Sequence, residues 1–375
     1  MRVHQTVNIE LLMNARRDSE ALLVALEDLL KEVPAVVRVE RRNAKQVKAL
    51  EVFRPDGLWK VGLKGGDSKV WVLEVKSLPL EPRIAEAAAV QVRRYLEAAG
   101  GDYGVVIAPF ISPRSAELLK REGLGYCDLS GNCRLVSGPL FIERSGFPNA
   151  HPRKAQHGNL FTPGAERVLR ALLDPAHAHR AWTLRDLAEV SYPGVSLGQV
   201  HKVVGRLEDQ AYMARSDLGL SVREPARLLE AWAGSYRFSR NREDRYYSSL
   251  KPVDLRKRFG DLVGGKTNKE RAGALASFSA ADVQAPHVRQ FRFFAYWRGD
   301  GSQLASVLEL KPVSSGDNVV VYSPYDEGVF YPASDWDEPV TAPVQTYLDL
   351  HASAARGEEA AQAIYDACLK EAYEG

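Results

Sequence analysis

Apolar and polar positions follow two different periods along the first part of the chain, and each change of period predicts a change of element. Two short runs rich in valine, leucine and tryptophan are typical of buried strands, and the Gly-Gly pair between them favours a tight hairpin. Helical composition follows and ends at a second Gly-Gly pair, a common helix stop. The expected elements are a helix capped by Asp18, strands over residues 58–63 and 70–75 joined by a turn at 65–67, a helix over 82–99, a strand over 103–109 and a helix that begins at Ser112.

The expected hairpin brings charged side chains from both strands to one end. Asp56 precedes the first strand, whereas Glu74 and Lys76 come at the end of the second. In an antiparallel pair these positions lie at the same edge, so we expect the two carboxylates to converge and Lys76 to lie beside them. Asp56 and Glu74 can then hold Mg²⁺ or Mn²⁺, and Lys76 can stabilise a phosphate or assist the attacking water. Plain alternation of charge at a strand end is the simpler interpretation.

The helix that follows adds another polar residue to this group. Gln91 and Tyr95 are four residues apart, so they lie on one helix face. Together with Asp56 and the pair Glu74 and Lys76, they resemble the motifs of the PD-(D/E)XK nuclease superfamily, and in particular of its RecB-like branch. The resemblance implies a restriction-endonuclease-like domain in which Gln91 joins the other three as a catalytic residue. The sequence leaves open whether such a site still cleaves DNA.

The middle of the chain has the pattern of three helices followed by a hairpin. Apolar residues recur every three or four positions in each helix, and Ser196 is a good cap for the third one. A glycine-containing turn then separates two short runs of strand composition. This order is typical of a winged helix-turn-helix, whose third helix enters the major groove of DNA. The expected helices span residues 165–173, 184–190 and 197–210, and the expected hairpin spans 212–222.

Polar residues of the third expected helix are the candidate contacts with double-stranded DNA. Gln199, Lys202 and Arg206 lie opposite its apolar stripe, and Arg215 lies on the expected wing. Lysine and arginine supply mostly phosphate affinity, whereas Gln199 is best suited to read a base edge. With Ser196 at the helix start, they form the predicted DNA-binding set. A structural module with a solvated basic face and a winged helix that binds protein are the alternatives.

A resemblance to one regulator family covers most of the chain. Its motifs are Glu-Val-Lys at 74–76, the apolar run and cap at 105–112, Tyr-Cys-Asp-Leu-Ser-Gly-Asn at 126–132, and the late segment 344–350 followed by Gly357. These are similar to motifs of the AbiEi-like, antitoxin-type transcriptional regulators of type IV toxin–antitoxin systems. The resemblance implies a bacterial DNA-binding regulator whose nuclease-like domain serves as a scaffold.

The predicted fold class is therefore an α/β multidomain protein. Its expected parts are a restriction-endonuclease-like α/β domain over residues 1–145, a linker over 146–163, a winged helix-turn-helix middle domain over 164–232 and a mixed α/β C-terminal domain over 248–375. Residues 232–247 interleave arginines with aromatics, which fits either nucleic-acid contact or an amphipathic connector helix. In the last domain Glu309 and Lys311 repeat the Glu-x-Lys pattern after an expected strand over 304–308, but no aspartate lies at the matching end of that hairpin.

Composition restricts the class of function further. The 375 residues are 45% apolar and 26% charged, and they contain no apolar run long enough to cross a membrane. The net charge of +2 is too small to indicate nucleic acid by itself, so a DNA-binding surface must be local. Cys127, Cys133 and Cys368 do not form a disulfide framework, and without a signal-peptide pattern they predict a cytoplasmic protein.

A phosphate-binding pattern, GxxxxGK[ST], occurs at residues 260–267. The charged residues before it do not form the buried strand that such a loop requires, so nucleotide binding is not expected. The sequence therefore predicts a DNA-binding protein, specifically a transcriptional regulator of antitoxin type that is compatible with a homodimer. The alternative is a metal-dependent DNA nuclease, which would need Mg²⁺ or Mn²⁺ as its cofactor.

Overall fold

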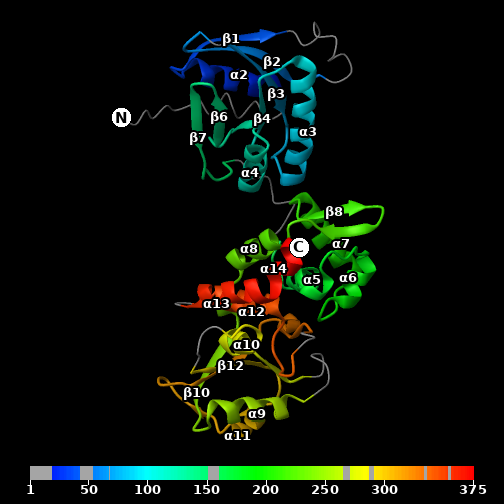
Figure 1. Cartoon of the computed structure of the whole chain (residues 1–375), viewed down its shortest axis with the longest axis vertical. Coiled ribbons are helices and arrows are strands. Elements are labelled where there is room, and N and C mark those ends of the chain that lie inside the picture. Colours follow the sequence, from blue (N-terminus) through cyan, green and yellow to red (C-terminus); the bar gives the residue numbers. More distant parts are fainter. Residues whose placement is uncertain are drawn as a thin grey trace. The chain divides into compact units, whose positions relative to one another are not determined.

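The chain divides into two compact units in the computed structural model (Figure 1). The structure describes residues 19–42, 54–66, 68–150, 160–264, 271–286, 291–332, 336–353 and 356–375. The first unit comprises residues 1–156 and 209–211, and the second comprises 157–208 and 212–375. Both contain helices and a β-sheet, so the prediction of a mixed α/β protein with more than one unit is confirmed at that level. The predicted cap Asp18, the turn residue Asp67 and residues 265–267 of the phosphate-binding pattern lie outside the described residues.

The described part of the first unit is built on a seven-stranded sheet whose strands lie side by side in chain order. Its elements are α2 (Ser19–Lys31), β1 (Val36–Arg42), β2 (Gly57–Leu63), β3 (Ser68–Val75), α3 (Pro82–Ala99), β4 (Tyr103–Ala108), α4 (Pro113–Arg121), β5 (Gly125–Asp128), β6 (Cys133–Ser137) and β7 (Leu140–Arg144). The middle strands β3, β4 and β5 are parallel, and the other neighbouring pairs are antiparallel. Parallel neighbours need crossover connections, which α3 and α4 provide.

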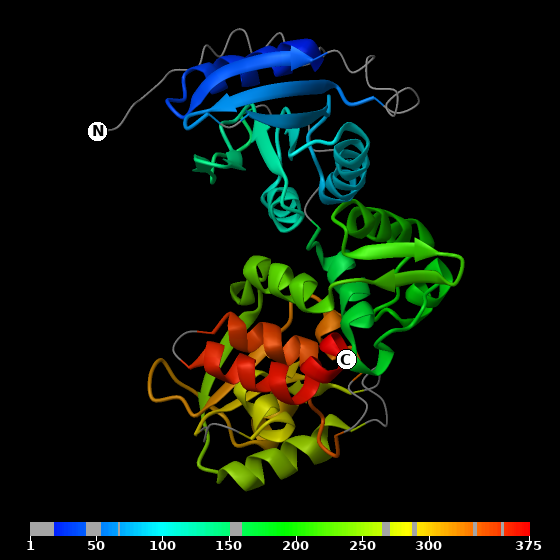
Figure 2. The same cartoon turned by 45° about the horizontal axis from the view of Figure 1, so that its top comes forward.

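Helices cover both faces of this sheet, with α2 on one side and α3 and α4 on the other (Figure 2). On the α2 face, Leu26 packs in one apolar cluster with Trp71. On the opposite face, Val92 of α3 and Leu119 of α4 pack in a second cluster with Val72. Because β3 is buried on both faces, its sequence is a nearly continuous apolar run, and the exception at its end is the acidic residue Glu74.

The second unit begins with the helices and the hairpin predicted for the middle of the chain. Its first elements are α5 (Pro163–Leu173), η4 (Pro175–His177), α6 (Leu184–Val190), α7 (Leu197–Asp209), β8 (Met213–Ser216), β9 (Gly219–Val222) and α8 (Pro225–Ser235). Thr183 and Asp186 form the expected capping box at the start of α6. A bridge between Trp182 and Leu220 adds a third short strand segment to the hairpin.

The remainder of the second unit surrounds a five-stranded sheet with the order β11-β12-β14-β10-β13 in the residues described. Its elements are η5 (Phe238–Arg240), β10 (Arg242–Tyr247), α9 (Pro252–Val263), β11 (Gly273–Leu275), α10 (Ser277–Gln284), β12 (Phe293–Trp297), α11 (Gly301–Val307), β13 (Lys311–Pro312), β14 (Val319–Ser323), η6 (Glu327–Phe330), α12 (Pro343–His351), α13 (Gly357–Ile364), η7 (Tyr365–Leu369) and α14 (Lys370–Glu374).

The structure contradicts two sequence interpretations in this region and agrees with a third. The strand expected over residues 304–308 is wrong, because the Asp300 carboxylate caps helix α11 there. A connector helix, one of the two interpretations given for 232–247, is wrong beyond residue 235, because α8 ends at Ser235 and residues 242–247 form the strand β10. The first residues of the phosphate-binding pattern, 260–263, belong to helix α9 and not to a loop that follows a buried strand.

A buried hydrogen-bond network connects α5 to α12. Arg170 of α5 is 1% exposed, and its Nε and Nη2 donate to Gln345 Oε1 at 2.9 and 2.6 Å. Gln345 Nε2 donates in turn to Asp349 Oδ1 at 2.7 Å. The hydroxyls of Tyr236 and Tyr296 also donate to Asp349 Oδ1, each at 2.9 Å. The segments predicted as separate middle and C-terminal domains therefore share one interior.

The pH dependence of stability offers a test of this network. Burial raises the pKa of Asp349 to about 7, although the hydrogen bonds from Tyr296, Tyr236 and Gln345 lower it. The pKa in the unfolded chain is roughly 3.9, so the folded protein holds this proton more strongly. We therefore expect the free energy of unfolding to fall as pH rises from about 4 to about 7 and to level off above that range.

Calorimetric unfolding of the wild type and of Asp349→Asn across this pH range measures the effect. The asparagine variant should lack the Asp349 contribution and show a flatter profile. Asp254→Asn, at an exposed position on α9, should keep the wild-type profile. Identical profiles for the wild type and Asp349→Asn would show that the carboxyl does not titrate in this way.

Candidate active site and candidate nucleic-acid interface

The hairpin of the first unit places two carboxylates at one edge. The register of β2 and β3 pairs Gly57 with Leu73, so Asp56 lies opposite Glu74. Asp56 is exposed, and its Oδ2 accepts a hydrogen bond from the Val75 backbone amide at 2.7 Å. Glu74 is 4% exposed and lies on the sheet face that α3 covers. The structure therefore brings both predicted metal ligands to the same end of the hairpin.

A chain of side-chain hydrogen bonds links Glu74 to α3. Lys76 Nζ donates to Glu74 Oε1 at 2.7 Å and to Gln91 Oε1 at 3.4 Å. Gln91 Nε2 donates to the Tyr95 hydroxyl at 2.6 Å. The helical spacing of Gln91 and Tyr95 thus aims both side chains at the strand end, as the sequence predicts. All four residues of the predicted catalytic set, Asp56 included, lie in one locality.

The electrostatics of Glu74 reflect this partly buried position. Burial raises its pKa, the hydrogen bond and charge of Lys76 lower it, and the negative charge of Asp56 raises it further. Within the described part of the chain, Glu74 Oε2 and Asp56 Oδ1 accept no side-chain or backbone hydrogen bond. Two hard oxygen ligands fit a divalent cation that completes its shell with water. No group of three or more His, Cys, Asp or Glu suited to a metal occurs among the described residues.

Asp128, in the motif at residues 126–132, has a structural task that the sequence reasoning missed. Its carboxylate accepts hydrogen bonds from the backbone amides of Ile111 at 3.1 Å, Ser130 at 2.9 Å and Asn132 at 2.9 Å. It therefore joins the β4–α4 loop to the β5–β6 turn. A short Asp-x-x-Gly-Asn turn signal could have predicted these local bonds, but not the one to Ile111.

The exposed face of α7 carries part of the predicted DNA-binding set. The Ser196 hydroxyl accepts a hydrogen bond from the Gln199 amide at 3.3 Å, which confirms that Ser196 caps this helix. Lys202 is exposed and Arg206 is half-buried. His201, which the sequence reasoning did not select, is exposed beside Lys202. The face opposite the apolar stripe of α7 is thus polar and carries positive charge.

Two other predicted DNA contacts are engaged with the protein itself. The half-buried Gln199 amide lies so close to Gly164 that a Cβ built there would approach Gln199 Nε2 to 1.5 Å. Arg215 Nε on the hairpin pairs with Glu208 Oε1 of α7 at 3.0 Å. Gln199 and Arg215 lie on the predicted DNA-binding surface. Because both contact other residues of the protein, neither is as available to a ligand as Lys202.

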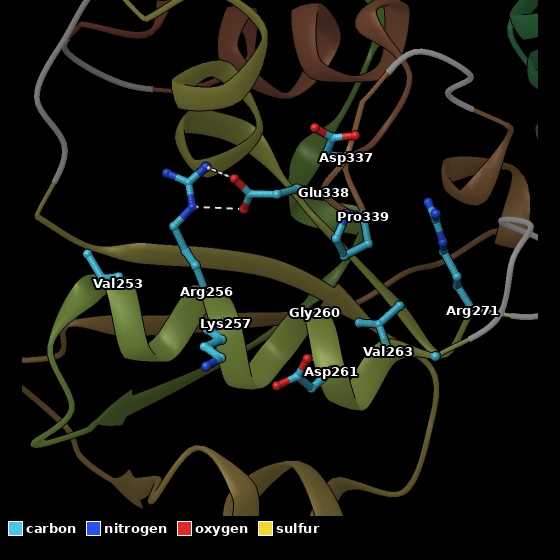
Figure 3. A pocket seen from close by; sticks show the side chains of 11 residues that line it. Val253, Arg256, Lys257, Gly260, Asp261, Val263, Arg271, Asp337, Glu338 and Pro339 are labelled. Carbon is cyan, nitrogen blue, oxygen red and sulfur yellow. Dashed lines mark hydrogen bonds and ion pairs between the residues drawn. The ribbon is translucent and has the colours of Figure 1, made fainter.

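A cavity of about 810 Å³ lies between α9 and the segment Asp337–Pro339 (Figure 3). Arg256 forms a bidentate ion pair with Glu338, in which Nη2 donates to Oε1 at 2.9 Å and Nε donates to Oε2 at 3.0 Å. The other charged side chains of the lining include both signs, so the cavity does not select one ligand charge. They are Lys257, Asp261, Arg271 and Asp337.

Comparison with known proteins identifies one family. Residues 221–370 match the model of a family described as "Transcriptional regulator, AbiEi antitoxin, Type IV TA system". This match covers less than half of the chain: that part is similar to the regulator family expected from the sequence, and the motifs at 74–76, 105–112 and 126–132 lie outside it. No curated protein matches the chain. None of the helices in the described residues is long and apolar enough to span a membrane.

A solved structure described as "Structure of EndoMS in apo form" aligns with 28% of this chain at 20% identity. The alignment spans 45% of that chain and has a TM-score of 0.19, so no functional conclusion follows from it.

Lys76 balances the charge of the nearly buried Glu74 carboxylate, with its Nζ 2.7 Å from Glu74 Oε1. Lys76→Met would leave the carboxylate of Glu74 without its cation, and we expect the free energy of unfolding to drop by about 1–3 kcal/mol. Adding Glu74→Gln removes the second charge and should restore most of that loss. Urea unfolding of the three proteins, with Lys64→Met at an exposed position as the control, tests this expectation. Equal stability of Lys76→Met and the wild type would contradict it.

Proposed function

We propose that this protein is a DNA-binding transcriptional regulator of the antitoxin type. It binds duplex DNA through α7 and the β8–β9 hairpin, which together with α5 and α6 form a winged helix-turn-helix. The observation that carries this proposal is the exposed, cationic face of α7, where Lys202 lies. The family match supports the regulatory role, but it begins at residue 221 and does not include α7.

The packing of α7 explains why this face is available. Val200 and Val203 are buried against the other helices, so Lys202 points away from the core. Leu218 lies in the turn between β8 and β9 and is 87% exposed, as expected of a residue at the tip of a wing. A helix presented in this way can enter the major groove while its hairpin reaches the adjacent backbone. The backbone amides at a helix start also attract phosphate.

Selection from a pool of randomised duplexes tests DNA binding directly. We expect a preferred duplex to be enriched, and Lys202→Ala to weaken binding to that duplex and to a scrambled one by a similar factor. Loss of one phosphate contact should reduce the slope of log K against log salt concentration by about 0.9. Lys257→Ala, at an exposed position on α9, is the matched control and should bind as the wild type does. Failure to enrich any duplex would refute the proposal.

The assembled Asp56, Glu74, Lys76 and Gln91 favour a second candidate function, metal-dependent cleavage of DNA in a PD-(D/E)XK-like first unit. Asp56 and Glu74 would hold Mg²⁺ or Mn²⁺, which when bound supplies charge stabilisation at the phosphate and a more acidic water. Lys76 would contribute positive charge beside the phosphate. Gln91, itself held by Tyr95 at 2.6 Å, would orient the Lys76 ammonium.

Cation binding and cleavage can be measured separately. If the site is active, the wild type should bind Mn²⁺, as followed by electron paramagnetic resonance, and nick plasmid DNA. We expect the double variant Asp56→Asn with Glu74→Gln to lose both properties. Glu32→Gln, at an exposed position in the turn after α2, should retain both. Intact duplex binding without cleavage would leave a regulator whose first unit is not catalytic.

A further inference from the structure

We propose that Tyr192 is a positioning residue for DNA recognition and that Arg298 holds it in place. Tyr192 lies in the turn between α6 and α7, whereas Arg298 follows β12 of the C-terminal sheet. This inference rests on the proposed binding of DNA by α7. It assigns to the C-terminal part of the second unit the task of fixing the direction of the recognition helix.

The turn before α7 is short and firmly attached at both ends. After α6 ends at Val190, the Ser191 hydroxyl donates to the Leu187 carbonyl at 2.6 Å. Ser196 then caps α7, so only three residues separate Tyr192 from that cap. The direction in which α7 leaves the turn therefore depends on where Tyr192 is held.

Arg298 is a rigid partner for Tyr192. Its Nη1 donates to the Tyr192 hydroxyl at 2.7 Å and contacts the Glu327 carboxylate at 3.2 Å. Its Nε donates to the Arg271 carbonyl at 2.9 Å, and its guanidinium lies 4.5 Å from the centre of the Phe330 ring. These contacts fix the guanidinium independently of Tyr192. The bond to the Tyr192 hydroxyl therefore holds the turn in a fixed position relative to the C-terminal sheet.

The Tyr192 ring is anchored separately from its hydroxyl. It is half-buried and packs against two apolar clusters, one containing Phe330 and the other containing Ala171 and Tyr331. Tyr192→Phe therefore keeps the ring contacts and removes only the bond to Arg298. The variant should fold as the wild type does and lose only the precise placement of α7.

A positioning residue and a phosphate contact leave different signatures on DNA binding. Phosphate contacts add affinity for every duplex, whereas contacts with base edges carry the sequence preference and require accurate placement. Loss of Lys202 should therefore weaken all duplexes and reduce the salt slope. Loss of the Tyr192–Arg298 bond should instead weaken the preferred duplex and leave non-specific binding unchanged.

The test compares affinities for the duplex selected by the wild type and for its scrambled sequence. We expect Tyr192→Phe to bind the selected duplex about tenfold more weakly, which corresponds to one charge-assisted hydrogen bond. Its affinity for the scrambled duplex and its salt slope should stay at the wild-type values. Tyr365→Phe, which removes a hydroxyl bonded to Glu374 at 2.8 Å, is the matched control and should bind both duplexes normally.

Arg298→Met removes the same bond from the other side and serves as a second variant. In the Arg298→Met background, Tyr192→Phe should cause no further loss of affinity for the selected duplex. The proposal is overturned if Tyr192→Phe keeps wild-type discrimination, or if it weakens both duplexes equally. Wild-type protein that binds no duplex would refute DNA binding itself, which distinguishes that failure from a failure of the positioning role.

Discussion

The second unit depends on the burial of one positive charge, the guanidinium of Arg170. Removing a charged group from water is expensive unless polar partners surround it. Here Gln345 accepts two of its hydrogen bonds, the Trp232 ring lies 5.2 Å from its central carbon, and the carboxylates of Glu166 and Asp326 favour its charge. Helix α5 therefore cannot shift against α12 without breaking the hydrogen bonds to Gln345 while the guanidinium is still buried.

This constraint holds α5, which packs in one apolar cluster with α7, against α12 of the C-terminal part of the second unit. Further bonds repeat the connection beside Arg170, since Arg167 pairs with Asp326 at 2.7 Å and Arg240 pairs with Glu166 at 3.1 Å. The family match includes α12 but not α5. The matched segment thus supplies Gln345 and Asp349 with the two tyrosines bonded to them, whereas Arg170 comes from α5, which belongs to the proposed winged helix-turn-helix.

The sequence predicted local features better than distant ones. The hairpin and its Glu74–Lys76 end were predictable because a period of two and a Gly-Gly turn are local signals. The edge strands β1 and β7 were missed because each is partly exposed and mixes charges with apolar residues. The apolar run at 304–308 was too short to separate strand from helix, and the Asp300 cap decided it. The Arg170 network joins residues 175 positions apart, a distance at which no sequence period operates.

The lysines of the two candidate sites differ in their exposure and in their pairing with other side chains. Lys202 is exposed on α7 and available to the first phosphate that approaches. Lys76 already donates to Glu74 and Gln91, and its side chain is only 25% exposed. A paired, recessed ammonium contributes little to long-range attraction, which comes from unpaired surface charge. Of the two lysines, Lys202 is therefore the one whose charge can attract a phosphate from a distance, if α7 binds DNA as we propose.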